Sequence, residues 1–391
     1  MEKLVDVVIV GAGPAGLATS ACLKSYSISN VVLEKEDCSA SLWKKRSYDR
    51  LKLHLAKQYC QLPYMPIPAE APVFVPRNAF IQYLDSYVTR FQLNPHYYRT
   101  VESAVFDEGI QKWRVIVQNT VENVTEIYVG KFLVVASGEN STGFIPDVVG
   151  LDEFSGEVMH SSEYQNGASF CDKDVLVVGC GNSGMEIAYD LAISGARTSI
   201  VARNPVHLLT KEIVYLGMFL LRILPVKIVD KICCSIGKLT HGNLTKYGLL
   251  RPRPGPFYLK ATTNRSPTID VGCIDKIKRG EVQVLTGITS IQKNKIKFEG
   301  GKVGHFDAII FATGYKNTVR NWLKNGEDVF DEKGKLQRRY PNHWQGENGV
   351  YCAGFSNRGL FGISEDAQNI AKNIDFIFKK KGERGNLAGI I

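Results

Sequence analysis

The chain has 391 residues, of which 44% are hydrophobic and 22% charged, and its formal net charge at pH 7 is +9. These values are ordinary for a folded globular protein of two or three domains. Because the basic residues are scattered and form no long run, we expect no nucleic-acid partner and favour anionic small molecules as ligands.

The N-terminal residues predict a strand, a glycine-rich turn and a helix. Residues 5–10 are apolar except for Asp6 and are typical of a buried parallel strand, and Gly11, Gly13 and Gly16 follow as G-x-G-x-x-G. These glycines allow a tight turn, close approach of the backbone to a pyrophosphate, and packing of the helix on the strand. The next strand ends in Glu34, which can accept hydrogen bonds from ribose hydroxyls. We therefore predict a first dinucleotide site, and its N-terminal position and its acid indicate FAD.

The start of the chain also bears on its location. The first residues run directly into the predicted strand, so we expect no secretory signal peptide. The prediction is a cytoplasmic protein, and a peripheral association with the endoplasmic reticulum stays open.

The same pattern recurs at residues 175–203. Gly179, Gly181 and Gly184 form a second glycine turn, a helix follows, and the next strand leads to Arg203. An arginine cannot accept a hydrogen bond from a ribose hydroxyl, but it can pair with a 2′-phosphate. The second site is therefore predicted to take NADPH, which would supply hydride to the flavin.

Two stretches after the second turn are candidates for a substrate pocket. Residues 213–229 are apolar but short for a membrane span, and they contain an Arg, a Pro and a Lys. We expect a buried or half-buried helix and no integral membrane span, and a lid or a membrane-surface contact stays open as an alternative. Residues 251–260 could shape an aromatic pocket, where Arg251 or Arg253 could meet a carboxylate, or they could be an ordinary surface loop.

Small residues at two strand ends indicate the domain organisation. Residues 131–150 and 306–317 each read as a strand followed by a small-residue turn, and they flank the second glycine turn. The prediction is an α/β fold with two dinucleotide-binding, Rossmann-like domains, in which the NADP domain is inserted into a discontinuous FAD domain. The predicted boundaries are 1–169 for the first part of the FAD domain, 170–304 for the NADP domain and 305–391 for the second part of the FAD domain.

The tail predicts another strand and a final helix. Residues 349–371 read as a strand, a loop containing Gly359 and Gly362, and a helix that begins near Ser364. The N-terminus of this helix would face the flavin and stabilise negative charge there.

One further pattern resembles a known family. Residues 154–164, FSGEVMHSSEY, have the form F-x-G-x-x-x-H-x-x-x-Y and lie between the two glycine turns. This arrangement resembles the class B flavin-containing monooxygenases. Residues 41–68 resemble the plant YUCCA branch, the indole-3-pyruvate monooxygenases, and FATGY at 311–315 and RGLFGISEDA at 358–367 agree. The resemblance extends from the first glycine turn to the tail helix.

The resemblance implies a flavin-dependent monooxygenase that converts indole-3-pyruvate to indole-3-acetate in auxin biosynthesis. NADPH would reduce FAD, reduced FAD would take up O2 as a peroxide at flavin carbon 4a, and oxidative decarboxylation of the keto acid would follow. The cofactor carries this chemistry, so we predict no catalytic side chain and no metal ligand. The resemblance places His54 opposite the flavin, where animal members usually have Asn. His160 and Tyr164 are expected to have structural or cofactor-positioning roles.

The residues predicted to bind the cofactors lie in the glycine turns, at the strand ends and in the segments that the resemblance adds. They are Gly11, Ala12, Gly13, Pro14, Ala15, Gly16, Glu34, Lys35, Leu42, Trp43, His54, Gly179, Cys180, Gly181, Asn182, Ser183, Gly184, Arg203, Ala312, Thr313, Gly314, Gly354 and Ser364.

Two other functions stay open from the sequence. One is an N- or S-oxygenating flavin monooxygenase that acts on another small nucleophile. The other is a non-catalytic FAD- and NADPH-binding protein that senses redox state. A disulfide reductase would need a C-x-x-C pair, and the nine cysteines contain none. The predicted partners are an aromatic 2-keto acid and O2, and the oligomeric state is not predicted.

Overall fold

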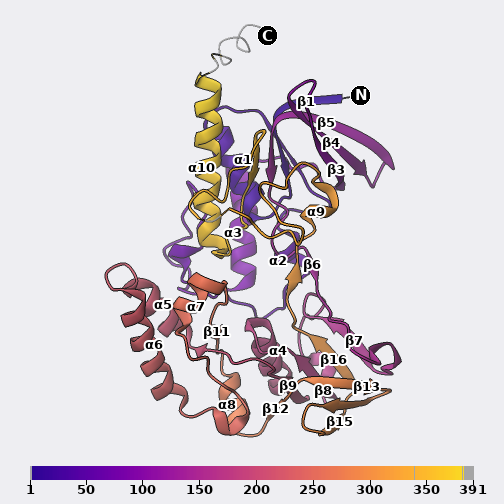
Figure 1. Cartoon of the computed structure of the whole chain (residues 1–391), viewed down its shortest axis with the longest axis vertical. Coiled ribbons are helices and arrows are strands. Elements are labelled where there is room, and N and C mark those ends of the chain that lie inside the picture. Colours follow the sequence, from indigo (N-terminus) through magenta and orange to yellow (C-terminus); the bar gives the residue numbers. More distant parts are fainter. Residues whose placement is uncertain (1, 339, 381, 383–391) are drawn as a thin grey trace.

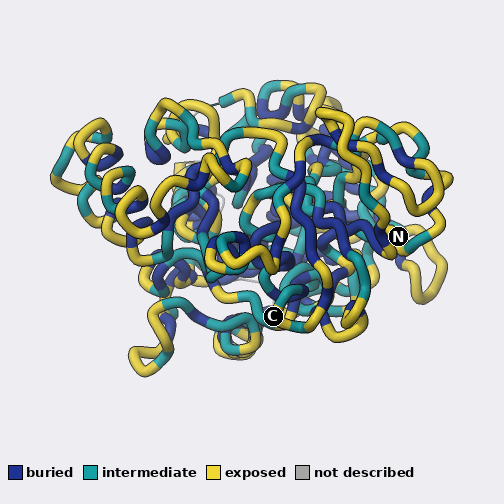
Figure 2. Tube along the Cα trace, turned by 90° about the horizontal axis from the view of Figure 1, so that it is seen from below, coloured by how far each residue is buried: buried dark blue, intermediate teal, exposed yellow. Residues whose placement is uncertain are grey.

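The structure is a computed structural model that describes residues 2–338, 340–380 and 382. Two large sheets lie one above the other in Figure 1, and the chain passes from the upper sheet to the lower one and back. Figure 2 shows the buried segments gathered in the interior and the exposed ones around the outside. The predicted α/β class with two Rossmann-like units is confirmed.

The first sheet has the strand order β2-β1-β5-β4-β3, and β18 pairs with the C-terminal part of β5. β1 runs parallel to β2 and β5, and β18 is parallel to β5, whereas β4 joins β5 and β3 in antiparallel pairs. The strands are β1 (Glu2–Val10), β2 (Asn30–Leu33), β3 (Arg99–Asp107), β4 (Lys112–Asn119), β5 (Val124–Val135) and β18 (Val350–Cys352).

Helices cover this sheet because alternate side chains of a strand point to opposite faces. Val7 and Ile9 of β1 pack into a core with helices α1, α3 and α10, while Val8 and Val10 pack on the other face with Trp322 and its neighbours. The helices are α1 (Pro14–Ser25), α2 (Ser41–Lys45), α3 (Arg77–Arg90), α9 (Val319–Trp322) and α10 (Gly359–Lys380), with a 3-10 turn η1 (Lys57–Tyr59).

The second sheet is parallel throughout, in the order β12-β9-β8-β16-β7. Val177 and Ile310 pack on one face against α4, and Leu176 and Ile309 pack on the other against a small antiparallel sheet. The elements are β7 (Glu157–His160), β8 (Asp174–Val178), α4 (Asn182–Ile193), β9 (Arg197–Val201), α8 (Cys273–Lys278), β12 (Val282–Leu285), β13 (Ile288–Gln292), β14 (Lys295–Phe298), β15 (Val303–His305) and β16 (Ala308–Phe311), with 3-10 turns η2 (Leu151–Glu153) and η3 (Ala168–Phe170).

Three helices, which we name the cap helices, lie between the two sheets on one side of the molecule (Figure 1). They are α5 (Lys211–Leu220), α6 (Val226–His241) and α7 (Pro256–Thr263), and β10 (Leu208–Leu209), β11 (Thr268–Ile269) and η4 (Thr245–Tyr247) accompany them. The apolar segment 213–229 was expected to form one buried or half-buried helix, but it forms parts of two helices because α6 begins after Pro225. More of its residues are exposed than buried, and the exposed ones include Phe219 and Ile223. In the described part of the chain, no helix is long and apolar enough to cross a membrane.

Both connections between the large sheets run side by side. β6 (Thr142–Gly143) on the way out pairs antiparallel with β17 (Tyr315–Lys316) on the way back. The predicted boundaries, at 169/170 and 304/305, do not coincide with this strand pair. They divide the second sheet, because β7 precedes the first boundary, β16 follows the second, and both strands belong to that sheet. Strand pairing places residues 157–311 together, and the division into domains stays a prediction.

The tail helix differs from its prediction. α10 begins at Gly359, five residues before Ser364, so the expected start near Ser364 is wrong. Its buried residues Ile363, Ala367, Ile370 and Ile374 recur every three or four positions and pack in the core beside α1. The helical pattern therefore extends through the small residues that the sequence analysis took for a loop.

Candidate active site between the two sheets

The two glycine turns have nearly the same geometry. Gly11 and Gly179 both have a left-handed φ, of +109° and +116°. A Cβ at Gly11 would lie 2.6 Å from the carbonyl oxygen of Ala136, and one at Gly179 would lie 2.5 Å from that of Ala312. The first position of each turn must therefore be glycine, because the backbone at the end of the neighbouring strand, β5 or β16, leaves no room for a side chain.

The later glycines of each turn have two different surroundings. A Cβ at Gly16 or Gly184 would lie 1.9 Å from the carbonyl oxygen of the first glycine of its own turn. At Gly13 and Gly181 nothing lies within 4 Å of a Cβ, and neither residue caps its helix with a side chain. The N-termini of α1 and α4 therefore present free N–H groups to open space, as a pyrophosphate requires. The structure fits two dinucleotides at these turns.

A cavity of about 590 Å³, which we call cavity A, adjoins the first turn. The predicted site residues that line it are Gly11, Gly13, Pro14, Ala15, Glu34, Lys35, Leu42, Trp43 and Gly354. A larger set lies outside the predicted site residues, and it includes Ala40, Ser41, Arg46, Arg99, Thr100, Glu102, Ser137, Gly138, Glu139, Asn140, Thr318, Asn321, Trp322, Gly359 and Leu360. Of these, Ser41, Arg46, the small-residue turn after β5 and the loop with Gly359 stand in stretches that the sequence analysis singled out. The others come from segments far apart in the chain, so no local motif marks them.

Glu34 is held in the wall of cavity A by the backbone. Its carboxylate accepts hydrogen bonds from the N–H groups of Ala12, at 2.7 Å, and Glu36, at 3.0 Å. Burial raises the pKa of this carboxyl group, against the opposing effect of the two N–H donors. Ala12 therefore contributes to the site through its backbone, and the carboxylate keeps lone pairs for a ribose.

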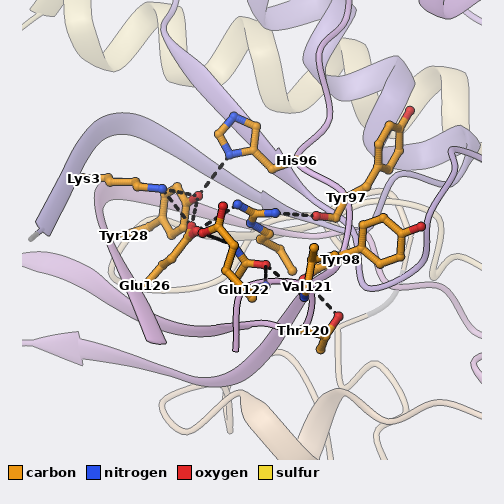
Figure 3. A network of polar contacts seen from close by, with 11 residues as sticks. Lys3, His96, Tyr97, Tyr98, Thr120, Val121, Glu122, Glu126 and Tyr128 are labelled. Atoms are coloured by element: carbon orange, nitrogen blue, oxygen red, sulfur yellow. Dashed lines mark hydrogen bonds and ion pairs between the residues drawn. The ribbon is translucent and has the colours of Figure 1, made fainter. Parts of the chain in front are cut away.

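A polar network gathers around Glu126, with Lys3 and Tyr128 beside it (Figure 3). Arg99, which lines cavity A, donates to the same carboxylate. Glu126 accepts from Lys3 at 2.8 Å, from Arg99 at 2.9 Å and from Tyr128 at 2.7 Å. Burial raises the pKa of the Glu126 carboxyl group, but these donors outweigh burial and lower that pKa to about 2. Two buried atoms of cavity A residues, Arg99 Nε and Ser137 Oγ, lack hydrogen-bond partners among the described residues. Such groups fit a polar ligand.

A second cavity of about 700 Å³, cavity B, lies between the segment after α2 and the cap helices. The predicted site residues that line it are Leu42, Trp43, His54, Asn182 and Ser183. Most of its other walls are apolar, and they include Leu51, Leu53, Leu55, Val214, Met218, Leu221, Phe257, Ile269, Leu360 and Phe361. Its composition suits an organic ligand with an aromatic part.

The two cavities meet along a common wall. The residues that line both are Leu42, Trp43, Arg46, Asn140, Gly359 and Leu360. The N-terminal turn of α10 contributes two of them, so the positive end of that helix lies where the cavities meet. Ligands in the two cavities would thus lie on either side of these six residues.

His54 joins the two halves of the molecule. Its Nε2 lies 3.1 Å from Oε1 of Glu186, a buried residue of α4. Burial, with the nearby Glu186 carboxylate, raises the pKa of the Tyr48 hydroxyl beside this pair. The imidazole lines cavity B and not cavity A, and its direct partner is a carboxylate of the second unit. Its expected place opposite the flavin stays a prediction.

Several predicted residues lie outside both cavities. Arg203 is exposed and its side chain forms no hydrogen bond or ion pair with the described residues. Ser364 donates a hydrogen bond to the carbonyl of Gln61 at 2.7 Å. Asn182, although it lines cavity B, uses its side-chain oxygen to accept from the N–H of Ile269. The others that line neither cavity are Ala12, Gly16, Gly179, Cys180, Gly181, Gly184, Ala312, Thr313 and Gly314.

Thr313 and Gly314 hold the connection between the sheets. Thr313 donates a hydrogen bond to the carbonyl of Phe144, and the carbonyl of Gly314 accepts from His160 Nε2 at 3.0 Å. Tyr164 is buried and donates to Asp190 of α4 at 2.6 Å. The histidine and the tyrosine of the eleven-residue pattern therefore form contacts within the second unit and with its return connection. Their expected structural or cofactor-positioning roles stay a prediction.

Comparison with known proteins agrees with this arrangement. The family described as pyridine nucleotide-disulphide oxidoreductase matches residues 8–212. Two relatives from Arabidopsis thaliana are named probable indole-3-pyruvate monooxygenase YUCCA10 and indole-3-pyruvate monooxygenase YUCCA6. The first is 56% identical over 94% of this chain and 96% of its own, and the second is 44% identical over 95% and 91%.

Solved structures share the fold. A flavin-containing monooxygenase from Stenotrophomonas maltophilia has a TM-score of 0.72 and 18% identity, covering 96% of this chain and 99% of its own. A cyclohexanone monooxygenase from Rhodococcus sp. Phi1, bound to NADP+, has a TM-score of 0.76 and 16% identity, covering 97% and 85%. The structures thus support the two-unit architecture, and the sequence relatives define the branch. The chain belongs to the YUCCA family of flavin-dependent monooxygenases.

Proposed function

We propose that this enzyme uses FAD and NADPH to convert indole-3-pyruvate to indole-3-acetate by oxidative decarboxylation. FAD would occupy cavity A, and NADPH would bind the second glycine turn and extend into cavity B. The observation that supports the proposal is the wall common to both cavities, because cofactors bound as proposed would lie close together there, beside an apolar chamber. The names of the Arabidopsis relatives support the substrate.

The residues of the chain would act on the cofactors by binding and orientation. The free N–H groups of α1 and α4 would bind the pyrophosphates, Glu34 would accept from the ribose of FAD, and Arg203 would pair with the 2′-phosphate of NADPH. The flavin, when bound, supplies hydride acceptance and activation of O2. The apolar walls of cavity B would exclude water from the reacting centre.

The test uses purified protein with its bound flavin. NADPH is added without air, and flavin absorbance is followed before and after air is admitted, with and without indole-3-pyruvate. The proposal expects rapid bleaching, faster return of the oxidised spectrum with the keto acid, and one indole-3-acetate for each NADPH consumed. Bleaching with no response to the keto acid would contradict the substrate and favour an amine or thioether, and no bleaching would contradict the enzyme mechanism.

A further inference from the structure

Cavity B is lined by four long cationic side chains, and their partners differ. Arg46 forms an ion pair with Glu36 at 2.5 Å, and Arg358 forms one with Glu365 at 2.5 Å. Lys52 is exposed to solvent. Lys260 is half-buried, and within the described part of the chain its ammonium donates one hydrogen bond, to the carbonyl oxygen of Asn357 at 2.6 Å. It forms no ion pair with the described residues, so its ammonium keeps free N–H donors.

The surroundings of Lys260 leave its positive charge without a direct counterion. The carboxylate of Glu139 acts on the Lys260 charge from a distance, and it accepts a hydrogen bond from the backbone N–H of Asn357 at 2.8 Å. Burial lowers the pKa of the Lys260 ammonium, and Glu139 offsets this lowering in part. A half-buried cation of this kind gains free energy when a ligand brings a carboxylate to it.

The neighbouring cap helices hold α7, the helix that carries Lys260. Asp230 of α6 accepts hydrogen bonds from the N–H groups of Phe257, at 2.8 Å, and Tyr258, at 3.1 Å, and so caps the N-terminus of α7. Phe257 and Lys260 are three residues apart on α7, so they lie on the same face, and both line cavity B. A Cβ at Gly217 of α5 would lie 2.2 Å from the Phe257 ring, which shows how closely that ring is seated.

We propose that Lys260 binds the carboxylate of an aromatic 2-keto acid, with the aromatic ring against Phe257 and the apolar wall of cavity B. This inference rests on the proposed function and names its substrate-binding cation. It also revises the sequence prediction for residues 251–260. Arg251 lines a separate cavity beside Leu208 and Asn243, whereas Lys260 at the end of the stretch reaches cavity B.

The experiment measures how much the carboxylate contributes to binding, apart from the ring and the ketone. Phenylpyruvate and phenylacetone share an aromatic ring and a ketone, and only the first carries a carboxylate. Their dissociation constants are measured by flavin absorbance on the oxidised holoenzyme with NADP+, which does not turn over. The variants are Lys260→Met, Lys260→Arg and, as a matched control from the same cavity, Lys52→Met. Flavin content and melting temperature establish that each variant is folded.

The proposal expects the wild type to bind phenylpyruvate at least ~10-fold more tightly than phenylacetone. Lys260→Met should weaken phenylpyruvate ~10- to 100-fold and leave phenylacetone within about threefold, while Lys260→Arg restores part of the loss and Lys52→Met changes neither. Equal weakening of both ligands would overturn the proposal, as would a wild type that does not prefer the acid.

Two further results distinguish this proposal from a nucleotide-binding role for Lys260 and from the proposed function. If Lys260→Met raises the KM for NADPH and leaves phenylpyruvate binding unchanged, the ammonium serves a nucleotide phosphate and the proposal is wrong. If the acid binds through Lys260 but the wild type forms no indole-3-acetate, the proposed function fails while the carboxylate site stands.

Discussion

Gly181 and Gly184 lie three residues apart in one turn, yet a side chain at each would meet different surroundings. Gly181→Val projects into open space, so it should cost about 1 kcal/mol of stability as a poorer helix cap but block the approach of the pyrophosphate. We expect the KM for NADPH to rise at least ~10-fold with bound flavin unchanged. Steady-state kinetics and the flavin-to-protein absorbance ratio provide the measurement.

Gly184→Val is the matched control for this prediction. Its Cβ would lie 1.9 Å from a backbone oxygen, so the variant should lose at least about 3 kcal/mol of unfolding free energy. Urea unfolding would show the difference. Loss of flavin from Gly181→Val at unchanged stability would mean that the two sites are not separable.

Arg203 offers a test of cofactor choice because its exposed side chain leaves the fold free to tolerate its loss. Arg203→Ala should lower the ratio of kcat/KM for NADPH to that for NADH by ~10- to 100-fold, since a charge-assisted pair with the 2′-phosphate is lost. Arg197→Ala, an exposed arginine at the other end of β9 that pairs with Asp174, is the control and should leave the ratio unchanged. Equal changes for both nucleotides would exclude the proposed pairing.

At the scale of elements, Glu126 connects β1, β3, β4 and β5 behind cavity A. The pKa of its carboxyl group falls from an ordinary 4.5 to about 2 in the folded chain. A lowered pKa stabilises the fold above the ordinary value, and this contribution is lost as pH falls from 4.5 toward 2. Glu126→Gln should therefore cost at most about 3 kcal/mol of unfolding free energy near neutral pH.

The pH dependence is the decisive measurement for this prediction. Denaturant unfolding of both proteins at several pH values should give curves that converge as pH falls below 4.5. A difference that stays constant with pH would mean that the substitution acts through packing alone. The network also orients Arg99, so the variant should bind flavin less tightly.

The elements differ in how far they were predictable from the sequence. The two strand–turn–helix units follow from local steric requirements. A Cβ on the first or third glycine of either turn would clash with a backbone oxygen within or beside that turn. The start of α10 was missed because Gly359 and Gly362 are typical of loops, and tertiary packing of Ile363 and Ala367 extends the helix through them. The walls of cavity A from Arg99 and Trp322 depend on sheet order, which no local motif encodes.

At the scale of the whole molecule, the paired connections predict that the second unit can be removed. The N–H of Phe144 donates to the carbonyl of Gly314 at 2.9 Å, so a short Gly-Ser linker can join these residues in place of 145–313. We expect the shortened protein to fold around the first sheet and keep FAD, because cavity A is lined only by residues outside the deletion. Dithionite should still reduce its flavin and NADPH should not.

The deletion also exposes apolar residues of the first unit that the second unit covers. The segment from Tyr48 to Leu55 loses its cover from α4 and the cap helices, so polar substitutions at Leu51 and Leu55 would be added to limit aggregation. Folded, monodisperse protein without flavin would contradict the independence of the first site.

The same paired connections have a mechanical consequence. Figure 1 labels β6 on one side between the two sheets and α7 on the other. The strands β6 and β17 join the two units on one side, and the hydrogen bond from Lys260 of α7 to the carbonyl of Asn357 joins them on the other. A carboxylate held by Lys260 would therefore add a third connection between the units, so that a bound substrate would resist their separation under mechanical load.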